Sequence, residues 1–286
     1  MSIDSRDDST FHLSGRVVFV TGGAGGFGRL MCEMAAARGA LVALTDVDGS
    51  AALSAAEELS AGGGEVIGLG LDVRDPSAFN AAVATTVERF GSLDVLINNA
   101  GTMPLAFFSD HAIAADAWER CIDINFKGTL NGICAVHDVM TEAGRGHVVN
   151  ISSIYGNAGT AGSGVYSATK AAVRVLSDSL RVESQGRIKV TVVRPTGVLN
   201  TGLASTVINP MAAVGITGAN QDRYTDAVMQ YLTGSVEGPG ADEDDPQFWA
   251  IEPETIAAEV IHAIDQPWGV VISDVTVRAT GEMFVI

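Results

Sequence analysis

Tyr166 and Lys170 lie four residues apart at the head of an apolar, Ala-rich segment that is typical of a helix. At this spacing the phenol and the ammonium share one helical face. A phenol has a pKa of about 10, and a nearby cation lowers that pKa by stabilising the phenolate. A general acid or base works best when its pKa is near the operating pH, so the pair is a candidate for proton transfer. For such a pair alone, an ordinary helix with a solvated lysine is the alternative.

Two further polar residues are candidates for the same chemistry. Ser153 follows a strand-like run that begins at Gly146, and its hydroxyl could orient the oxygen that gains or loses a proton. A serine hydrolase is excluded because no Gly-x-Ser-x-Gly motif surrounds Ser153. Asn125 falls inside a long helix expected over residues 118–140. A mid-helix asparagine is mildly unfavourable and tends to mark a special role, although a solvent-facing side chain is the alternative.

A glycine-rich loop over residues 21–28, Thr-Gly-Gly-Ala-Gly-Gly-Phe-Gly, connects an apolar strand to a helical run that ends at Arg38. Glycines let the backbone approach a pyrophosphate, and a helix N-terminus offers free N–H groups and the positive end of a dipole. The strand–loop–helix context is the one that a dinucleotide-binding motif requires. Taken alone, the loop could also be a tight turn.

Asp46 ends a second predicted strand, 18 positions after Gly28. A carboxylate at this place hydrogen-bonds the adenosine ribose and repels a 2′-phosphate. Neither the glycine loop nor the stretch just beyond Asp46 contains an Arg or Lys that could receive that phosphate. The sequence therefore predicts NAD rather than NADP. Asp46 could instead be the N-cap of the next helix.

The elements that must position these residues alternate between strand and helix at a spacing of about 25 to 30 residues. This pattern predicts an α/β fold with a doubly wound, Rossmann-type parallel sheet and helices on both faces. A ligand would lie beyond the carboxyl ends of the strands, where Gly22–Gly28, Asp46, Asp72 and Asn98–Gly101 fall.

The chain ends and the stretch after the sixth strand have a different composition. Residues 1–14 are polar and are expected to be a flexible leader, and residues 15–286 a single domain. Residues of about 200–250 are interrupted by Gly, Pro and Asn yet carry many apolar side chains. We expect loops that form a lid over an apolar substrate, with disorder as the alternative. The acidic run at 242–245 is interpreted as a solvated bend.

Composition narrows the possible partners. The 286 residues carry a net charge of −17 without a basic cluster, which argues against nucleic acid and anionic membranes. Neither a signal peptide nor an apolar run of roughly 20 residues is present. Three widely spaced cysteines in apolar helical patterns predict reduced core thiols and a cytoplasmic protein. The five histidines lack metal-ligand spacing, so no metal is expected.

Taken together, these motifs resemble the short-chain dehydrogenase/reductase family. The motifs are Thr21-Gly-x-x-x-Gly-x-Gly28, Asp72, Asn98-Asn-Ala-Gly101, Asn125, Ser153 and Tyr166-x-x-x-Lys170. Ser153 and Tyr166 are 13 residues apart, which is the spacing found in the family. The resemblance is strong over roughly residues 14–201 and loose over 253–280. It implies an NAD-preferring, single-domain oxidoreductase.

The resemblance also implies roles for the matching positions. Tyr166 would be the general acid/base and Ser153 would hold the reacting oxygen. Lys170 would bind the nicotinamide ribose and lower the pKa of Tyr166, and Asn125 would anchor a water that relays the proton. The residues implied at the cofactor are Gly22, Gly26, Phe27, Gly28, Asp46, Asp72, Val73, Asn99, Ala100, Gly101, Tyr166, Lys170, Pro195, Gly197, Val198 and Thr201.

The sequence departs from the family pattern after Pro195. Thr196 replaces the glycine that commonly follows this proline. The expected threonine is also displaced by one position to Thr201, with Asn200 in its usual place, so either residue could contact the cofactor. The family further implies a homotetramer, or less often a dimer, built on the helices at 118–140 and 166–183.

The sequence thus predicts an NAD-dependent alcohol dehydrogenase or ketoreductase that interconverts a secondary alcohol and its ketone. The apolar character of Met103, Ile154, Tyr155 and the lid favours a terpenoid, alicyclic, steroid or aryl substrate. Two alternatives remain open. The chain could use NAD for redox-neutral epimerisation or dehydration, or it could be a non-catalytic NAD-binding regulatory protein.

Overall fold

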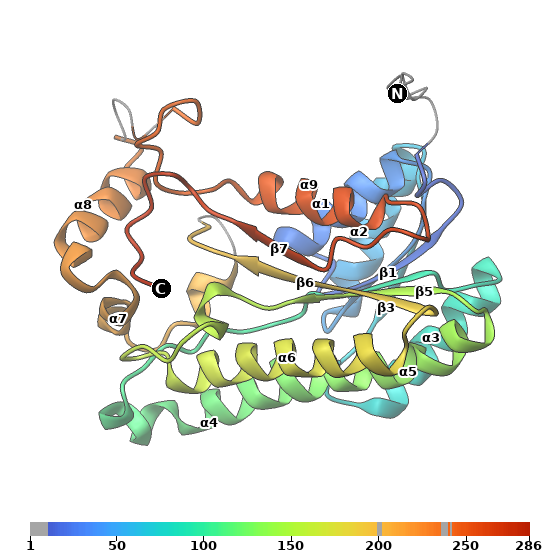
Figure 1. The fold of residues 1–286 in the computed structure, drawn as a ribbon, viewed down its shortest axis with the longest axis horizontal. Coiled ribbons are helices and arrows are strands. Elements are labelled where there is room, and N and C mark those ends of the chain that lie inside the picture. The colour runs from blue at the N-terminus through green and yellow to red at the C-terminus, as the bar shows by residue number, and fades with distance from the viewer. Residues whose placement is uncertain (1–10, 199–201, 236–239, 241) are drawn as a thin grey trace.

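The computed structural model describes residues 11–198, 202–235, 240 and 242–286. In this part of the chain, parallel strands form one seven-stranded sheet in the order β3-β2-β1-β4-β5-β6-β7 (Figure 1). The strands are β1 Val17–Thr21, β2 Leu41–Asp46, β3 Glu65–Gly70, β4 Val95–Asn98, β5 Gly146–Ile151, β6 Ile188–Pro195 and β7 Asp274–Val277. The order reverses between β1 and β4, where such sheets bind ligands. The predicted α/β fold with a doubly wound parallel sheet is confirmed.

Helices cover both faces of the sheet (Figure 1). One face carries α1 Gly26–Ala37, α2 Gly49–Ala61 and α9 Pro253–Ile264, and the other carries α3 Pro76–Phe90, α4 His111–Cys121, α5 Gly128–Glu142 and α6 Gly164–Glu183. Each face has its own apolar core, with Met31 and Ile261 in the first and Phe79 and Val136 in the second. Because both faces are covered, β1 is a continuous apolar run that is buried throughout.

The helix expected at 118–140 is longer than predicted and contains an irregular turn. It starts at His111 with α4, passes through a π-helical segment at Ile122–Lys127, and continues as α5 to Glu142. Such single π-turns inside α-helices are frequent at functional sites. Asn125 lies in this turn and is 1% exposed, so the solvent-facing alternative for this residue is wrong.

The segment after β6 is more helical than predicted. We expected loops over about 200–250, yet the described residues include short 3₁₀ turns, α7 Val214–Thr217 and α8 Gln221–Leu232. One of these turns begins at Pro210 and is capped by Asn209, whose side chain accepts the Met211 N–H. The prolines and asparagines that suggested loops therefore start short helices here.

The start of the domain also differs from the prediction. Leu13 falls inside the predicted leader, yet its side chain is fully buried and its N–H donates to Asp265 Oδ1 at 2.8 Å. The packed part of the chain therefore begins by Leu13, and residues 1–10 lie outside the described part.

The cysteines agree only in part with their prediction. All three are free, and Cys32 and Cys121 are buried as predicted, but Cys134 on α5 is exposed rather than in the core. Among the described residues, no helix is long and apolar enough to cross a membrane.

Buried amides connect the middle of the sheet to α6. Asn98 Nδ2 donates to Asn150 Oδ1 at 2.8 Å, and Asn150 Nδ2 donates to Ser177 Oγ at 2.8 Å. Asn150 and Ser177 are fully buried. Because buried polar groups are costly without partners, this chain of bonds fixes β4, β5 and α6 relative to one another.

We predict that Asn150→Ala lowers the free energy of unfolding by about 1–3 kcal/mol, because it leaves the buried Asn98 amide without its acceptor. Urea unfolding followed by circular dichroism measures this loss. Asn157→Ala is the matched control, because Asn157 is exposed in the loop after β5. Equal losses in the two variants would contradict the role given to the buried amides.

Candidate active site

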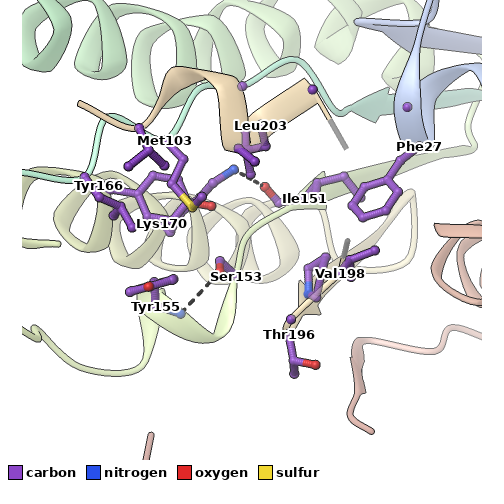
Figure 2. A pocket seen from close by; sticks show the side chains of 18 of the residues that line it. Phe27, Met103, Ile151, Ser153, Tyr155, Tyr166, Lys170, Thr196, Val198 and Leu203 are labelled. Carbon is purple, nitrogen blue, oxygen red and sulfur yellow. Dashed lines mark hydrogen bonds between the residues drawn. The ribbon is translucent and has the colours of Figure 1, made fainter. Parts of the chain in front are cut away.

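A cavity of about 630 Å³ opens at the carboxyl ends of the strands (Figure 2). Most residues predicted from the sequence line it, although they come from distant parts of the chain. They are Gly22, Gly26, Phe27, Asp46, Asn99, Ala100, Gly101, Ser153, Tyr166, Lys170, Pro195, Gly197 and Val198. Its volume lies in the range of small-molecule and cofactor sites.

The proton-transfer candidates converge on one side of this cavity. Tyr166 and Lys170 lie in the first two turns of α6, and Ser153 directly follows β5. Each is less than a tenth exposed. Lys170 Nζ donates to Ile151 O at 2.8 Å and lies 5.8 Å from the centroid of the Tyr166 ring. Figure 2 shows Phe27 across the cavity from this group.

The pKa of Tyr166 shifts in the direction opposite to the expectation. Burial raises the pKa of this phenol above its usual value, and a hydrogen bond with the Ser153 hydroxyl opposes this only in part. Burial also lowers the pKa of Lys170 to about 8. Loss of water penalises the charged form of both groups, and this tertiary effect outweighs what the i, i+4 spacing alone suggests.

Asn125 does not line the cavity, but it forms hydrogen bonds with residues next to the site. Its Oδ1 accepts the Thr102 N–H at 2.9 Å. Its Nδ2 donates to Thr102 O at 2.9 Å and to Thr169 Oγ1 at 3.2 Å. Thr169 Oγ1 in turn donates to Tyr166 O at 2.7 Å. The asparagine thus links the loop after β4 to the turn of α6 that carries Tyr166, and its water-relay role stays a prediction.

The glycine loop forms a cradle that larger residues would fill. Gly22 and Gly26 have positive φ angles of 64° and 50°, which favour glycine. A Cβ on Gly28 would lie 2.0 Å from Gly22 O, so Gly28 allows close packing of α1 behind the loop. The helix begins without a side-chain cap, which leaves its first N–H groups free for a ligand. These features fit the pyrophosphate of a dinucleotide.

Asp46 lies at the end of β2 beside this loop. Its half-buried carboxylate accepts the N–H groups of Ala24 and Asp48, each at 3.2 Å. Asp48, not Asp46, is the N-cap of α2, and it accepts N–H groups from Ser50 and Ala51. The alternative role of Asp46 as a helix cap is therefore wrong.

Three of the described residues predicted at the cofactor do not line the cavity: Gly28, which packs behind the glycine loop, and Asp72 and Val73. The Asp72 carboxylate is engaged by Arg74, whose Nη2 lies 2.6 Å away, and this contact lowers the pKa of Asp72. Val73 is buried, and its carbonyl accepts Asn131 Nδ2 at 2.9 Å. Arg74 was missed, although a cation two residues after an aspartate is a recognisable local partner.

The stretch after β6 contributes both expected and unexpected residues. Thr196 lines the cavity, and its Oγ1 is buried without a hydrogen-bond partner in the part of the chain described. Asn200 and Thr201 lie outside the described residues. Phe284, near the C-terminus, also lines the cavity and was missed, because no motif indicates that a tail residue returns to the site.

The family model for short chain dehydrogenases matches residues 16–211. The chain therefore belongs to the short-chain dehydrogenase/reductase family and is an oxidoreductase, a dehydrogenase of alcohols.

Among its curated relatives is the 3-alpha-(or 20-beta)-hydroxysteroid dehydrogenase of Mycobacterium tuberculosis. It is 40% identical over 221 residues, which cover 77% of this chain and 83% of the relative. The 2,5-dichloro-2,5-cyclohexadiene-1,4-diol dehydrogenase LinX of Sphingobium indicum is 35% identical over 196 residues, 68% of this chain and 77% of the relative.

Solved structures share the fold. A short-chain dehydrogenase/reductase from Burkholderia phymatum in complex with NAD has a TM-score of 0.72 at 24% identity, covering 93% of this chain and 90% of that one. An alcohol dehydrogenase from Thermococcus sibiricus complexed with 5-hydroxy-NADP also has a TM-score of 0.72, at 21% identity, covering 93% of this chain and 97% of that one.

We predict that the cost of burying Lys170 makes stability depend on pH. The pKa of Lys170 is about 8 in the folded chain, against 10.5 for an ordinary lysine, so the unfolded chain binds more protons between these pH values. Stability contributed by this site therefore rises with pH across that window. Relative to Lys170→Met, the wild-type free energy of unfolding should increase by roughly 2 kcal/mol from pH 7 to pH 10.

Urea unfolding at the two pH values measures this difference. Lys127→Met is the control, because Lys127 is exposed and Asp123 raises its pKa, so no such gain is expected. If the difference in the free energy of unfolding between wild type and Lys170→Met is the same at both pH values, the Lys170 ammonium is not destabilised in the folded protein.

Proposed function

We propose that this protein catalyses reversible hydride transfer between NAD and a secondary alcohol or its ketone. The observation that carries the proposal is the convergence of buried Ser153, Tyr166 and Lys170 on the cavity that also contains the glycine cradle and Asp46. A phenol, a hydroxyl and an amine around one space can move a proton and stabilise charge on a single oxygen.

In the oxidative direction, Tyr166 accepts the proton of the substrate hydroxyl in its phenolate form. Because burial raises the pKa of this phenol, that form depends on the positive charge of Lys170 and of the oxidised nicotinamide that would lie nearby. Ser153 donates a hydrogen bond to the same oxygen and fixes its position. The Lys170 ammonium, anchored on Ile151 O, offsets the negative charge that develops there. Asn125 acts through Thr102 and Thr169 to hold the acid/base in place. NAD, when bound, supplies the hydride acceptor.

The residues suited to holding NAD lie along the other half of the cavity. The loop at Gly22–Gly28 and the free N-terminus of α1 suit the pyrophosphate, and Asp46 suits the adenosine ribose. Asp72 and Val73 are not part of this proposal, because they do not line the cavity. The solved relatives carry NAD in one case and an NADP derivative in the other, so NAD preference rests on Asp46.

The substrate side of the cavity is apolar. Side chains of Met103, Leu203, Val207, Ile216 and Phe284 line it. Both curated relatives have names that denote dehydrogenases of ring alcohols, one steroidal and one alicyclic. We infer an alicyclic, steroid, terpenoid or aryl alcohol, with oxidation as the direction that NAD preference favours.

The assembly and location are also proposals. An open apolar groove between the 3₁₀ turn Phe108–Asp110, the π-helical segment Ile122–Lys127 and α6 is lined by residues that include Phe108, Ile122 and Val165. This groove suits the homotetramer or dimer inferred from the family. The free cysteines suit a cytoplasmic protein.

We predict that Asp46→Ala lowers the preference for NAD over NADP by about tenfold or more, which corresponds to about 1.4 kcal/mol. The substitution removes a ribose hydrogen-bond acceptor and a charge that repels the 2′-phosphate. The ratio of kcat/KM for the two cofactors measures the change. Asp48→Ala is the control, because Asp48 caps α2 two residues away. An unchanged ratio in Asp46→Ala would remove this residue from the ribose site.

We predict that Tyr166→Phe loses about 10²- to 10⁴-fold in kcat while still binding NADH, because the acid/base is removed and the cradle is left intact. NADH absorbance with a panel of cyclic secondary alcohols measures turnover, and NADH fluorescence measures binding. Substrate conversion without an absorbance change would indicate redox-neutral chemistry. Full turnover in Tyr166→Phe would reject the assigned acid.

A further inference from the structure

Three of the four tyrosines of the chain line the cavity, and the proposed mechanism uses one of them. Tyr166 moves the proton. Tyr155 comes from the turn after β5 and lies beside Ser153 (Figure 2), and Tyr224 comes from α8. The second and third phenols therefore bring polar groups to a wall that is otherwise mostly apolar.

Neither of these phenols has a hydrogen bond to any part of the chain that the structure describes. Tyr155 is 9% exposed, and burial raises the pKa of both Tyr155 and Tyr224. The pKa of Tyr155 is raised further by Tyr166 and Tyr224. Tyr155 is buried and Tyr224 is half-buried, and both line the cavity, so a ligand bound there can offer their hydroxyls a hydrogen-bond partner.

Ring contacts hold both phenols in place. The Tyr155 ring meets the Tyr166 ring edge to face, with 5.5 Å between the centroids. The Tyr224 ring lies between Trp249, at 6.1 Å, and Phe284, at 5.7 Å. Rings packed in this way cannot easily swing towards solvent, so their hydroxyls are preorganised to meet a ligand in the cavity.

The charge around the cavity limits what that ligand group can be. Among the described lining residues, Lys170 is the one cation, and it is already placed beside the reacting oxygen. A carboxylate or phosphate at the Tyr155–Tyr224 wall would therefore be buried without a counter-charge. A neutral oxygen accepts from a phenol and, as a hydroxyl, also donates to one.

We propose that the substrate carries a second neutral oxygen group, a hydroxyl or a ketone remote from the reacting carbon, and that Tyr155 and Tyr224 bind it. The substrate class is then a ring-based diol, hydroxyketone or diketone rather than a simple alcohol. The two tyrosines are specificity residues, because they contact the substrate away from the bonds that change. This inference rests on the proposed function.

The test compares substrates that share a ring system and differ in the second oxygen. Cyclohexanol is paired with cyclohexane-1,4-diol, and 5α-androstan-3α-ol with its 17-keto derivative. We expect the second oxygen to raise kcat/KM for NADH formation by about ten- to a hundredfold in the pair that fits the cavity. Equal kcat/KM values within both pairs would overturn the proposal.

Two variants locate the effect. In Tyr155→Phe and Tyr224→Phe, the ratio of kcat/KM between the paired substrates should fall towards one. Tyr231→Phe is the matched control. It removes a phenol hydroxyl from α8, the helix that carries Tyr224, and Tyr231 does not line the cavity. A ratio that keeps its wild-type value in both cavity variants would also overturn the proposal. Thermal melting temperatures of all three verify that each variant is folded.

The results distinguish failure of this inference from failure of the proposed dehydrogenase function. If NADH formation requires Tyr166 but has the same kcat/KM with and without the second oxygen, the inference of a second oxygen group is rejected. The proposed dehydrogenase function is then retained. No NADH from any of the four substrates, with bound NADH still detected by fluorescence, counts against both.

Discussion

The hydrogen bond from Lys170 to the carbonyl of Ile151 joins α6, which carries the proposed acid/base Tyr166, to β5, the strand that precedes Ser153. A buried ammonium is tolerated only where acceptors surround it, so this contact fixes how α6 lies across the end of β5. The buried amides of Asn98 and Asn150 strengthen the same junction from the sheet, and the hydrogen bonds of Asn125 strengthen it from the π-helical segment between α4 and α5. The relative positions of Ser153, Tyr166 and Lys170 are therefore a consequence of how β4, β5 and α6 are joined.

Much of the site follows from local rules that can be read in the sequence. The positive φ angles and close approach in the loop at Gly22–Gly28 require glycine, and Asp46 at the carboxyl end of β2 lies at the edge of the sheet where the cavity opens. The i, i+4 spacing of Tyr166 and Lys170 likewise fixes their shared face. The doubly wound sheet follows from the alternation of strands and helices. Residues whose position is set by backbone geometry close to them in the chain are thus the predictable ones.

The features that the sequence did not predict depend on distant contacts or on solvation. Asp72 is engaged by Arg74, and Phe284 reaches the cavity from the end of the chain. The pKa of Tyr166 rises because the folded chain excludes water from the phenol, which spacing along a helix does not reveal. The segment at about 200–250 was expected to form loops because Pro and Asn interrupt long helices. The same residues also begin short helices, and the sequence alone did not distinguish the two cases. Tyr224 lines the cavity because it lies on α8, a helix that the sequence did not predict.

The small apolar cluster of Trp249, Ala250 and Met283 beneath α8 is distinct from the two cores that flank the sheet. Helix α8 has no fully buried residue. Its partly buried side chains pack against this cluster; they are Tyr224, Ala227, Val228 and Tyr231. Elements that bury little surface open at a lower free-energy cost than the rest of a domain. Local opening at α8 is therefore expected to cost less free energy than opening of the sheet or of the junction between β4, β5 and α6.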